Sequence, residues 1–184
     1  MVDLLKGALS HNDNGLVFVY TGNGKGKTTA AMGQALRAVG HGFKVLVIQF
    51  MKGRKYGEVV AAEKYLPDIT IHQCGLDRFV IKDDLKPDDI GLAQKGLNLA
   101  KKALRAGDYD MVILDELNVA VDFGLVSVQD VVEMIKSRMP SIDLVLTGRY
   151  APQKIIELAD TVSEFKEIKH HYAAGVTERA GIEF

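Results

Sequence analysis

The sequence feature that most constrains this chain is an apolar segment followed at once by a glycine-rich loop. Residues Leu16–Tyr20 form an uninterrupted apolar run, which is typical of a β-strand buried on both faces. The next segment, Thr21–Thr29, reads Thr-Gly-Asn-Gly-Lys-Gly-Lys-Thr-Thr, and helix-forming residues continue to Val39. A strand, a glycine loop and a helix in this order form an anion-binding site, because backbone N–H groups and the positive end of the helix dipole point at the same place.

The loop follows the second half of the phosphate-binding loop (P-loop) pattern, which is Gly-x-x-x-x-Gly-Lys-Ser/Thr. Gly26, Lys27 and Thr28 occupy the last three positions of this pattern, whereas Thr21 occupies the place of its first glycine. Lys27 offers a mobile positive charge to phosphate groups, and the hydroxyl of Thr28 is an oxygen ligand of the kind that Mg²⁺ prefers. A dinucleotide-binding fingerprint does not fit the spacing of the glycines. The remaining alternative is a flexible loop that binds nothing.

The rest of the chain alternates between apolar runs and segments with helical periodicity. Strands are predicted at 16–20, 45–50, 69–72, 111–114, 144–147 and 161–168, and helices at 28–39, 58–66, 87–106, 127–138 and 152–159. Uninterrupted apolar strands that alternate with helices are typical of a mostly parallel sheet with helices on both faces. We therefore expect a single α/β domain over 15–184, preceded by a short N-terminal arm at 1–14.

Two further strand ends carry side chains that suit a nucleotide site. The strand at 111–114 leads into Asp115 and Glu116, where one carboxylate can bind or position a metal ion and the other can orient water or a second group. The strand at 144–147 is followed closely by Arg149, which can bind phosphate through two hydrogen bonds. An exposed arginine without a role is the alternative for Arg149. Ligands of such sheets bind at the carboxyl ends of the strands, so we expect these groups near the glycine loop.

The charge balance and the single cysteine limit the classes of function. The chain has 23 Lys and Arg residues against 24 Asp and Glu, so its formal net charge of −1 argues against nucleic acid or an anionic membrane as the main partner. It contains no run of 18 apolar residues, and residues 1–14 lack the pattern of a secretory signal. Cys74 is the one cysteine, which excludes an intrachain disulfide and fits a reducing compartment. We expect a soluble, cytoplasmic protein.

Further blocks of residues follow the P-loop in a definite order. The blocks are Thr21–Thr29, Arg37–Gly42, Gln49–Gly53, Val112–Leu117, Leu146–Arg149, Leu158–Asp160, Lys169–His170, Ala174–Gly175 and Gly181–Phe184. In this order, and from about Leu16 to the end of the chain, they resemble the ATP:corrinoid adenosyltransferases of the CobA/BtuR type. Several separate blocks are far more specific than one P-loop. The resemblance implies a RecA-like P-loop fold, usually in a homodimer.

The resemblance also implies a reaction and a set of site residues. The family transfers the 5′-deoxyadenosyl group of MgATP to the cobalt(I) of a reduced corrinoid and releases triphosphate, and a reduced flavin or flavodoxin supplies the electron. By resemblance, Lys27, Thr28 and Glu116 are the catalytic residues, and Thr28 and Glu116 hold Mg²⁺. The ATP-binding residues that the resemblance implies are Gly22, Asn23, Gly24, Lys25, Gly26, Lys27, Thr28, Thr29, Arg37 and Arg149.

Three residues are implied for the corrinoid. The family commonly has a Phe-x-Trp pair against the lower face of the corrinoid, and here Phe79 takes the first place and Ile81 the second, because the chain contains no Trp. The other interpretation of Phe79 is a buried anchor of its loop. His170 lies near the corrinoid pocket by resemblance. Longer members cover the corrinoid with an N-terminal helix, and the arm at 1–14 is shorter than that.

Two other classes of function stay open from the sequence. A P-loop phosphotransferase or ATPase would cleave ATP at the γ-phosphate, although no second basic cluster resembles a kinase lid. A non-catalytic module would bind a nucleotide or a corrinoid without reaction. The sequence leaves open whether the corrinoid is complete cobalamin or a precursor.

Overall fold

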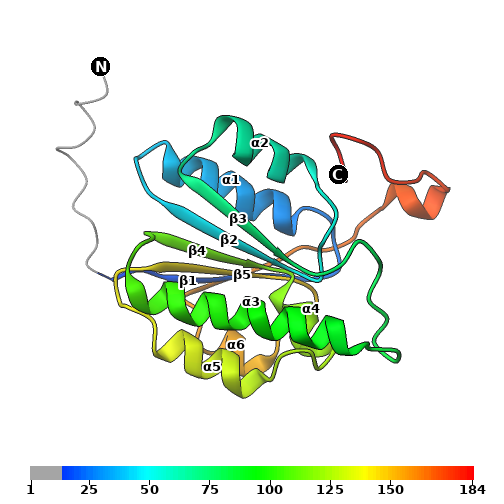
Figure 1. Cartoon of the computed structure of the whole chain (residues 1–184). Helices are drawn as coiled ribbons and strands as arrows, with labels where there is room; N and C mark the ends of the chain where they lie inside the picture. Colours follow the sequence, from blue (N-terminus) through cyan, green and yellow to red (C-terminus); the bar gives the residue numbers. More distant parts are fainter. Residues whose placement is uncertain (1–13) are drawn as a thin grey trace.

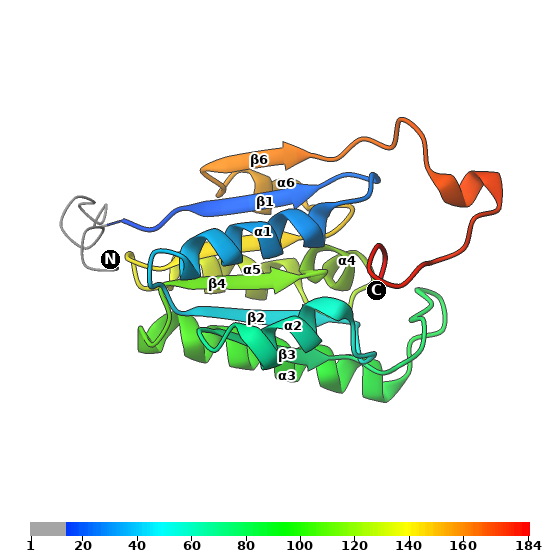
Figure 2. The ribbon, with the colours of Figure 1, turned by 90° about the horizontal axis from the view of Figure 1, so that it is seen from above.

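A computed structural model of the chain describes residues 14–184, and the predicted arm lies outside the described residues except for Asn14. Six strands form one sheet in which every neighbouring pair is parallel, in the order β3-β2-β4-β5-β1-β6 (Figures 1 and 2). The strands are β1 (Val17–Thr21), β2 (Val45–Phe50), β3 (Ile69–Cys74), β4 (Met111–Asp115), β5 (Asp143–Thr147) and β6 (Thr161–Glu164). The expected α/β domain with a parallel sheet is confirmed.

Helices cover both faces of the sheet, as the apolar strands require. The helices are α1 (Lys27–Val39), α2 (Gly57–Tyr65), α3 (Pro87–Ala106), α4 (Leu117–Asp122), α5 (Val128–Lys136) and α6 (Gln153–Ile156), with a 3₁₀ turn η1 (His171–Ala174). Helices α1 and α2 lie on one face, and α3, α4, α5 and α6 lie on the other (Figure 1). Within residues 14–184, no helix is long and apolar enough to cross a membrane.

Strand β2 shows why both faces need cover, because all six of its residues are buried. Val45 and Val47 pack into the cluster under α1 and α2, whereas Leu46, Ile48 and Phe50 pack into the cluster under the other four helices. Successive side chains of a strand point to opposite faces, so a continuous apolar run fills two cores at once.

Three elements in the second half of the chain differ from the prediction. Helix α4 was not predicted, because its six residues are too few to show a helical period. The helix predicted at 152–159 ends at Ile156, and the chain then turns so that the Asp160 carboxylate accepts a hydrogen bond from the Val17 N–H at 2.7 Å. The strand predicted at 161–168 ends at Glu164, because its partner β1 ends at the paired residue Thr21.

The loops after β2 and β3 lie against each other at two glycines. A Cβ atom at Gly75 would lie 2.4 Å from the backbone nitrogen of Lys52, and one at Gly53 would lie 2.5 Å from the backbone carbon of Leu76. Only glycine permits such a close approach of two backbones. The pair therefore fixes where the chain leaves β2, and with it the position of Lys52.

We expect Gly75→Ala to lower the free energy of unfolding by about 1–3 kcal/mol, because the added methyl group overlaps backbone atoms that cannot move independently. The matched control is Gly91→Ala in α3, where no atom lies within 4 Å of the added Cβ. That control should gain about 0.5–1 kcal/mol from its better helix propensity. Thermal unfolding measures both, and equal melting temperatures for the two variants would contradict the close approach.

Candidate active site

The carboxyl ends of the strands meet at one edge of the sheet, beside a cavity of about 680 Å³. The cavity is lined by the glycine loop and first turns of α1, by residues between Lys52 and Ala61, by Glu116 and Arg149, and by parts of the C-terminal segment 170–184. Figure 2 shows the C-terminus at the end of the sheet where β2 and β4 end. Segments from the whole length of the chain therefore converge on one cavity.

Backbone strain is concentrated at this edge. Within residues 14–184, three residues other than glycine have positive φ angles: Met51 (58°) directly after β2, Glu116 (60°) directly after β4, and Tyr150 (61°) shortly after β5. A left-handed conformation costs roughly 1–2 kcal/mol for such residues. Strain of this kind persists only where the surrounding structure over-determines it, and it gathers at functional sites.

The glycine loop leaves the N-terminus of α1 open to a ligand. Gly22 and Gly26 have φ angles of 94° and 113°, which glycine adopts without strain. Among the described residues no side chain caps the N-terminus of α1, and its first turn holds no acidic residue. The N–H groups of this turn and the helix dipole are therefore available for an anion.

Lys27 lies folded over its own loop. Its Nζ donates hydrogen bonds to the carbonyl oxygens of Gly22 (2.8 Å) and Gly24 (2.7 Å). Burial, and secondarily the nearby Arg149, lower the pKa of Lys27, although the carboxylates of Glu116 and Asp115 act in the other direction. A phosphate oxygen is a stronger partner for this ammonium than a neutral carbonyl is, because both groups of that hydrogen bond are charged.

The Asp115 carboxylate is buried and receives four hydrogen bonds. Its Oδ1 accepts from the hydroxyls of Thr28 (2.8 Å) and Thr147 (2.7 Å), and its Oδ2 accepts from Nζ of Lys52 (2.7 Å) and Nε2 of Gln49 (3.3 Å). Burial raises the pKa of Asp115, but the ammonium of Lys52 and the two hydroxyls outweigh burial and hold it below its usual value. The group is therefore a buried, ionised and fully hydrogen-bonded carboxylate.

Glu116 differs from Asp115 in its hydrogen bonds and in the direction of its pKa shift. Its left-handed backbone places it at the start of α4, where its N–H donates to the hydroxyl of Thr147 at 3.0 Å and its side chain faces the cavity. Among the described residues nothing donates a hydrogen bond to the Glu116 carboxylate. Burial, followed by the negative charge of Asp115, raises the pKa of Glu116. Such a carboxylate has both oxygens available for a cation.

Most of the predicted nucleotide-binding residues lie at the cavity. Those that line it are Asn23, Gly24, Lys25, Gly26, Lys27, Thr28, Thr29 and Arg149, and Gly22 adjoins them. Arg37 does not line the cavity, since it is exposed in the last turn of α1, about 15 Å along the helix from Lys27. Its predicted role with ATP stays a prediction.

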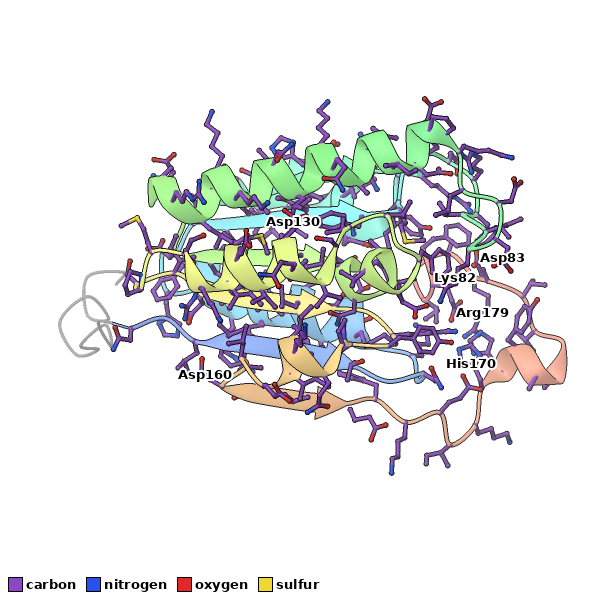
Figure 3. All side chains as sticks on the ribbon, turned by 90° about the horizontal axis from the view of Figure 1, so that it is seen from below. Lys82, Asp83, Asp130, Asp160, His170 and Arg179 are labelled. Carbon is purple, nitrogen blue, oxygen red and sulfur yellow. The ribbon has the colours of Figure 1, made fainter. Side chains whose placement is uncertain are left out.

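The three predicted corrinoid residues lie at the same end of the molecule. Phe79 and Ile81 are 87% and 61% exposed on the loop between β3 and α3, so the interpretation of Phe79 as a buried anchor is wrong. His170 lines the cavity. Figure 3 shows His170 and Arg179 at the end of the molecule where that loop carries Lys82 and Asp83. The loop therefore lies at the same end of the molecule as the C-terminal segment, part of which lines the cavity.

The C-terminal residues are part of the site, which the sequence analysis did not predict. Nζ of Lys25 donates to the carbonyl oxygen of Ile182 at 2.9 Å and lies 3.8 Å from the Glu183 carboxylate. The same carboxylate lies 3.3 Å from Nε2 of His171. The ring of Phe184 stacks 4.2 Å from the guanidinium of Arg54. These contacts hold the end of the chain against the glycine loop.

The sequence pattern singled out Asp115 only as one of two candidate carboxylates, and no site role was predicted for Lys52, Gln49 or Thr147. A signal for these three was present, since Gln49 and Lys52 belong to one block of the family resemblance and Thr147 belongs to another. Thr147 also stands at a strand end. Its role depends on β5 lying between β1 and β4 in the sheet.

The fold and the site together define a P-loop protein that binds a nucleotide at the carboxyl edge of a parallel sheet. The chain belongs to a particular family of that class, because residues 13–184 match the family described as ATP:corrinoid adenosyltransferase BtuR/CobO/CobP. The corrinoid adenosyltransferase of Escherichia coli K12 is 38% identical over 178 residues, which cover 96% of this chain and 89% of that protein.

Two other relatives are similar to the same extent. The corrinoid adenosyltransferase of Pseudomonas aeruginosa is 36% identical over 96% of this chain and 87% of its own length. The corrinoid adenosyltransferase CobA of Salmonella typhimurium is 36% identical over 96% of this chain and 89% of its own length. The family resemblance drawn from the sequence blocks is therefore confirmed.

We expect Glu116→Gln to unfold at a higher temperature than the wild type, by roughly 2–4 °C, the shift that 1 kcal/mol gives in a chain of this size. A folded-state pKa above the unfolded one means that ionisation of Glu116 at neutral pH costs folding free energy, and the amide removes that cost. The difference in melting temperature should be complete at pH values above the raised folded-state pKa of Glu116. It should disappear at pH values below the ordinary pKa of 4.5. Exposed Glu133→Gln is the control, and a pH-independent difference would contradict the account.

Proposed function

We propose that this chain transfers the 5′-deoxyadenosyl group of ATP to the cobalt(I) of a reduced corrinoid and releases triphosphate. One observation carries the proposal: the glycine loop, Lys27, Arg149 and Glu116 converge on one cavity in a chain of the ATP:corrinoid adenosyltransferase family. The three relatives named above carry the name corrinoid adenosyltransferase.

The reaction is a displacement at the C5′ carbon of ATP. Cobalt(I) contributes both electrons of the new cobalt–carbon bond and becomes formally cobalt(III), while the electron pair of the broken C5′–O bond leaves with the triphosphate. No proton moves in this step, so the site needs no general base. The site has to hold the two substrates in line and stabilise the charge that develops on the leaving oxygen.

The residues of the cavity suit that task. The N–H groups at the start of α1 and the ammonium of Lys27 offer hydrogen bonds to phosphate oxygens, and Arg149 adds a guanidinium from the end of β5. Lys27 is buried, and there its charge stabilises a developing anion more strongly than in solution. Lys27 is the residue best placed to follow the charge, because only neutral carbonyls hold it.

We propose that Thr28 and Glu116 hold Mg²⁺ with the nucleotide. The residues fit the ion, because Thr28 donates its hydroxyl proton to Asp115 and so keeps a lone pair for a cation, and the Glu116 carboxylate has no protein donor among the described residues. Both are hard oxygen ligands of the kind that Mg²⁺ takes. When bound, Mg²⁺ supplies positive charge to the leaving triphosphate.

The remaining parts of the proposal concern the corrinoid and its supply. We propose that Phe79 and Ile81 contact the lower face of the corrinoid and that His170 lies beside it, since Phe79 and Ile81 are exposed and His170 lines the cavity. A reduced flavin or flavodoxin supplies the electron that gives cobalt(I). The working form is a homodimer in the cytoplasm.

The deciding experiment is an anaerobic incubation of the protein with MgATP and chemically reduced cobalamin, or with a reduced precursor corrinoid. Absorbance follows the cobalt–carbon product, and chromatography separates triphosphate from ADP and phosphate. We expect adenosylated corrinoid and triphosphate in equal amounts, and neither from Thr28→Ala. Release of phosphate without a cobalt–carbon bond would overturn the proposal and move cleavage to the γ-phosphate. Binding of both substrates without any product would point to a binding module.

We expect Phe79→Ala and Ile81→Ala to raise the KM for the corrinoid about tenfold or more, because burying a large side chain against a ligand contributes roughly 1.5–3 kcal/mol. The KM for ATP should stay within about twofold. The melting temperature should not change, since both side chains are exposed in the free protein. Leu36→Ala, another exposed apolar residue, is the control on the far end of α1. Unchanged corrinoid KM values would remove this loop from the site.

A further inference from the structure

The cavity contains a second buried ammonium that the proposed mechanism does not use. Lys52 follows the strained residue Met51 at the end of β2, lines the cavity, and has a side chain that is only 16% exposed. Its Nζ donates a hydrogen bond to Oδ2 of Asp115 at 2.7 Å. The same Nζ lies 3.4 Å from the hydroxyl oxygen of Thr28.

The environment of Lys52 keeps this ammonium charged. Burial lowers the pKa of Lys52, but the charge and hydrogen bond of Asp115, with further help from Glu116 and Glu58, outweigh burial and hold the pKa above its usual value. The ammonium is therefore ion-paired with Asp115 at the wall of the cavity. A buried ion pair contributes little net stability compared with apolar groups, so its presence there calls for another reason.

The position of Lys52 beside Thr28 gives that reason. Thr28 is the residue through which a P-loop takes a metal ion, and an ammonium 3.4 Å from its hydroxyl oxygen occupies the space of a cation. A divalent cation at Thr28 would repel Lys52 strongly at such a distance. When Asp115 releases Lys52, the neutral donors Thr28, Thr147 and Gln49 still bind it through hydrogen bonds. The acceptors that a nucleotide brings into this cavity are phosphate oxygens.

We propose that Lys52 is a second phosphate-binding lysine of the nucleotide site. Asp115 holds it beside Thr28 in the free protein, and it turns to a phosphate oxygen when the metal–nucleotide complex binds. The inference rests on the proposed function only in taking the cavity to be the ATP site. Lys52 then exchanges one anionic partner, the Asp115 carboxylate, for another, a phosphate group.

Nucleotide binding without corrinoid tests the assignment. Calorimetry measures the Kd of MgATP, inorganic triphosphate and adenosine for the wild type and for Lys52→Met. We expect Kd for MgATP and for triphosphate to rise about 10- to 100-fold, the equivalent of one charge-assisted hydrogen bond, and Kd for adenosine to stay unchanged. Lys52→Arg keeps the charge and should restore most of the affinity. Lys55→Met is the matched control, because Lys55 is exposed on the same loop and pairs with Glu63.

Manganese binding to the nucleotide-free protein tests the position beside Thr28. In Lys52→Met, Asp115 lacks its counter-ion and the space at Thr28 holds no ammonium. Electron paramagnetic resonance should therefore show Mn²⁺ binding about tenfold or more tighter than in the wild type. Equal Mn²⁺ affinity in Lys52→Met and Lys55→Met would overturn the proposed position.

A pair of variants keeps the test decisive if Lys52→Met does not fold. Asp115→Asn frees Lys52 from its carboxylate, and the double variant with Lys52→Met replaces both charges by neutral groups, which buried ion pairs tolerate. We expect the double variant to bind ATP in EDTA at least about tenfold more weakly than Asp115→Asn alone. Equal affinity would overturn the assignment. This test does not depend on the reaction. A protein that forms no adenosylated corrinoid would still reveal whether ATP binding depends on Lys52.

Discussion

The Asp115 carboxylate is the interaction on which the rest of the site depends. Its four donors come from different parts of the chain: Thr28 from α1, Gln49 from β2, Lys52 from the loop after β2, and Thr147 from β5. A buried carboxylate that loses a hydrogen-bond donor destabilises the folded state. The position of each donor therefore constrains the positions of the others. The glycine loop is thereby fixed relative to three strands, and the cavity is organised before any ligand binds.

The strain at the site is supported by the two apolar cores. Met51, Glu116 and Tyr150 adopt left-handed conformations at the ends of strands whose side chains are almost all buried. Because the strands cannot shift without opening both cores, the backbone beyond them has to turn sharply where the cavity begins. The same turn that strains Glu116 aims its carboxylate at the cavity. The buried strands thus both stabilise the sheet and place the reactive groups at the cavity.

The parts that could be predicted from the sequence are those encoded locally. The continuous apolar runs predicted the parallel sheet, and the glycine loop predicted the anion site, since strand, loop and helix adjoin in sequence. Helix α4 is too short to show a period. The pairing of Lys52 with Asp115 depends on β2 lying beside β4 in the register Gln49↔Asp115, which no spacing reveals. The contact of Lys25 with Ile182 joins residues 157 positions apart and exists only in the folded chain.

The positive charges of the site favour the transfer step but oppose release of the triphosphate product. Lys27, Lys52 and Arg149 line the cavity together with Glu116, and the buried Asp115 pairs with Lys52. On the proposed reaction, the triphosphate product carries one negative charge more than the triphosphate ester of ATP. Groups that stabilise the transition state by binding this charge bind the product more tightly than the substrate. The carboxylate of Asp115 then has a second consequence, because it competes with the product for Lys52 and so favours departure of triphosphate after transfer.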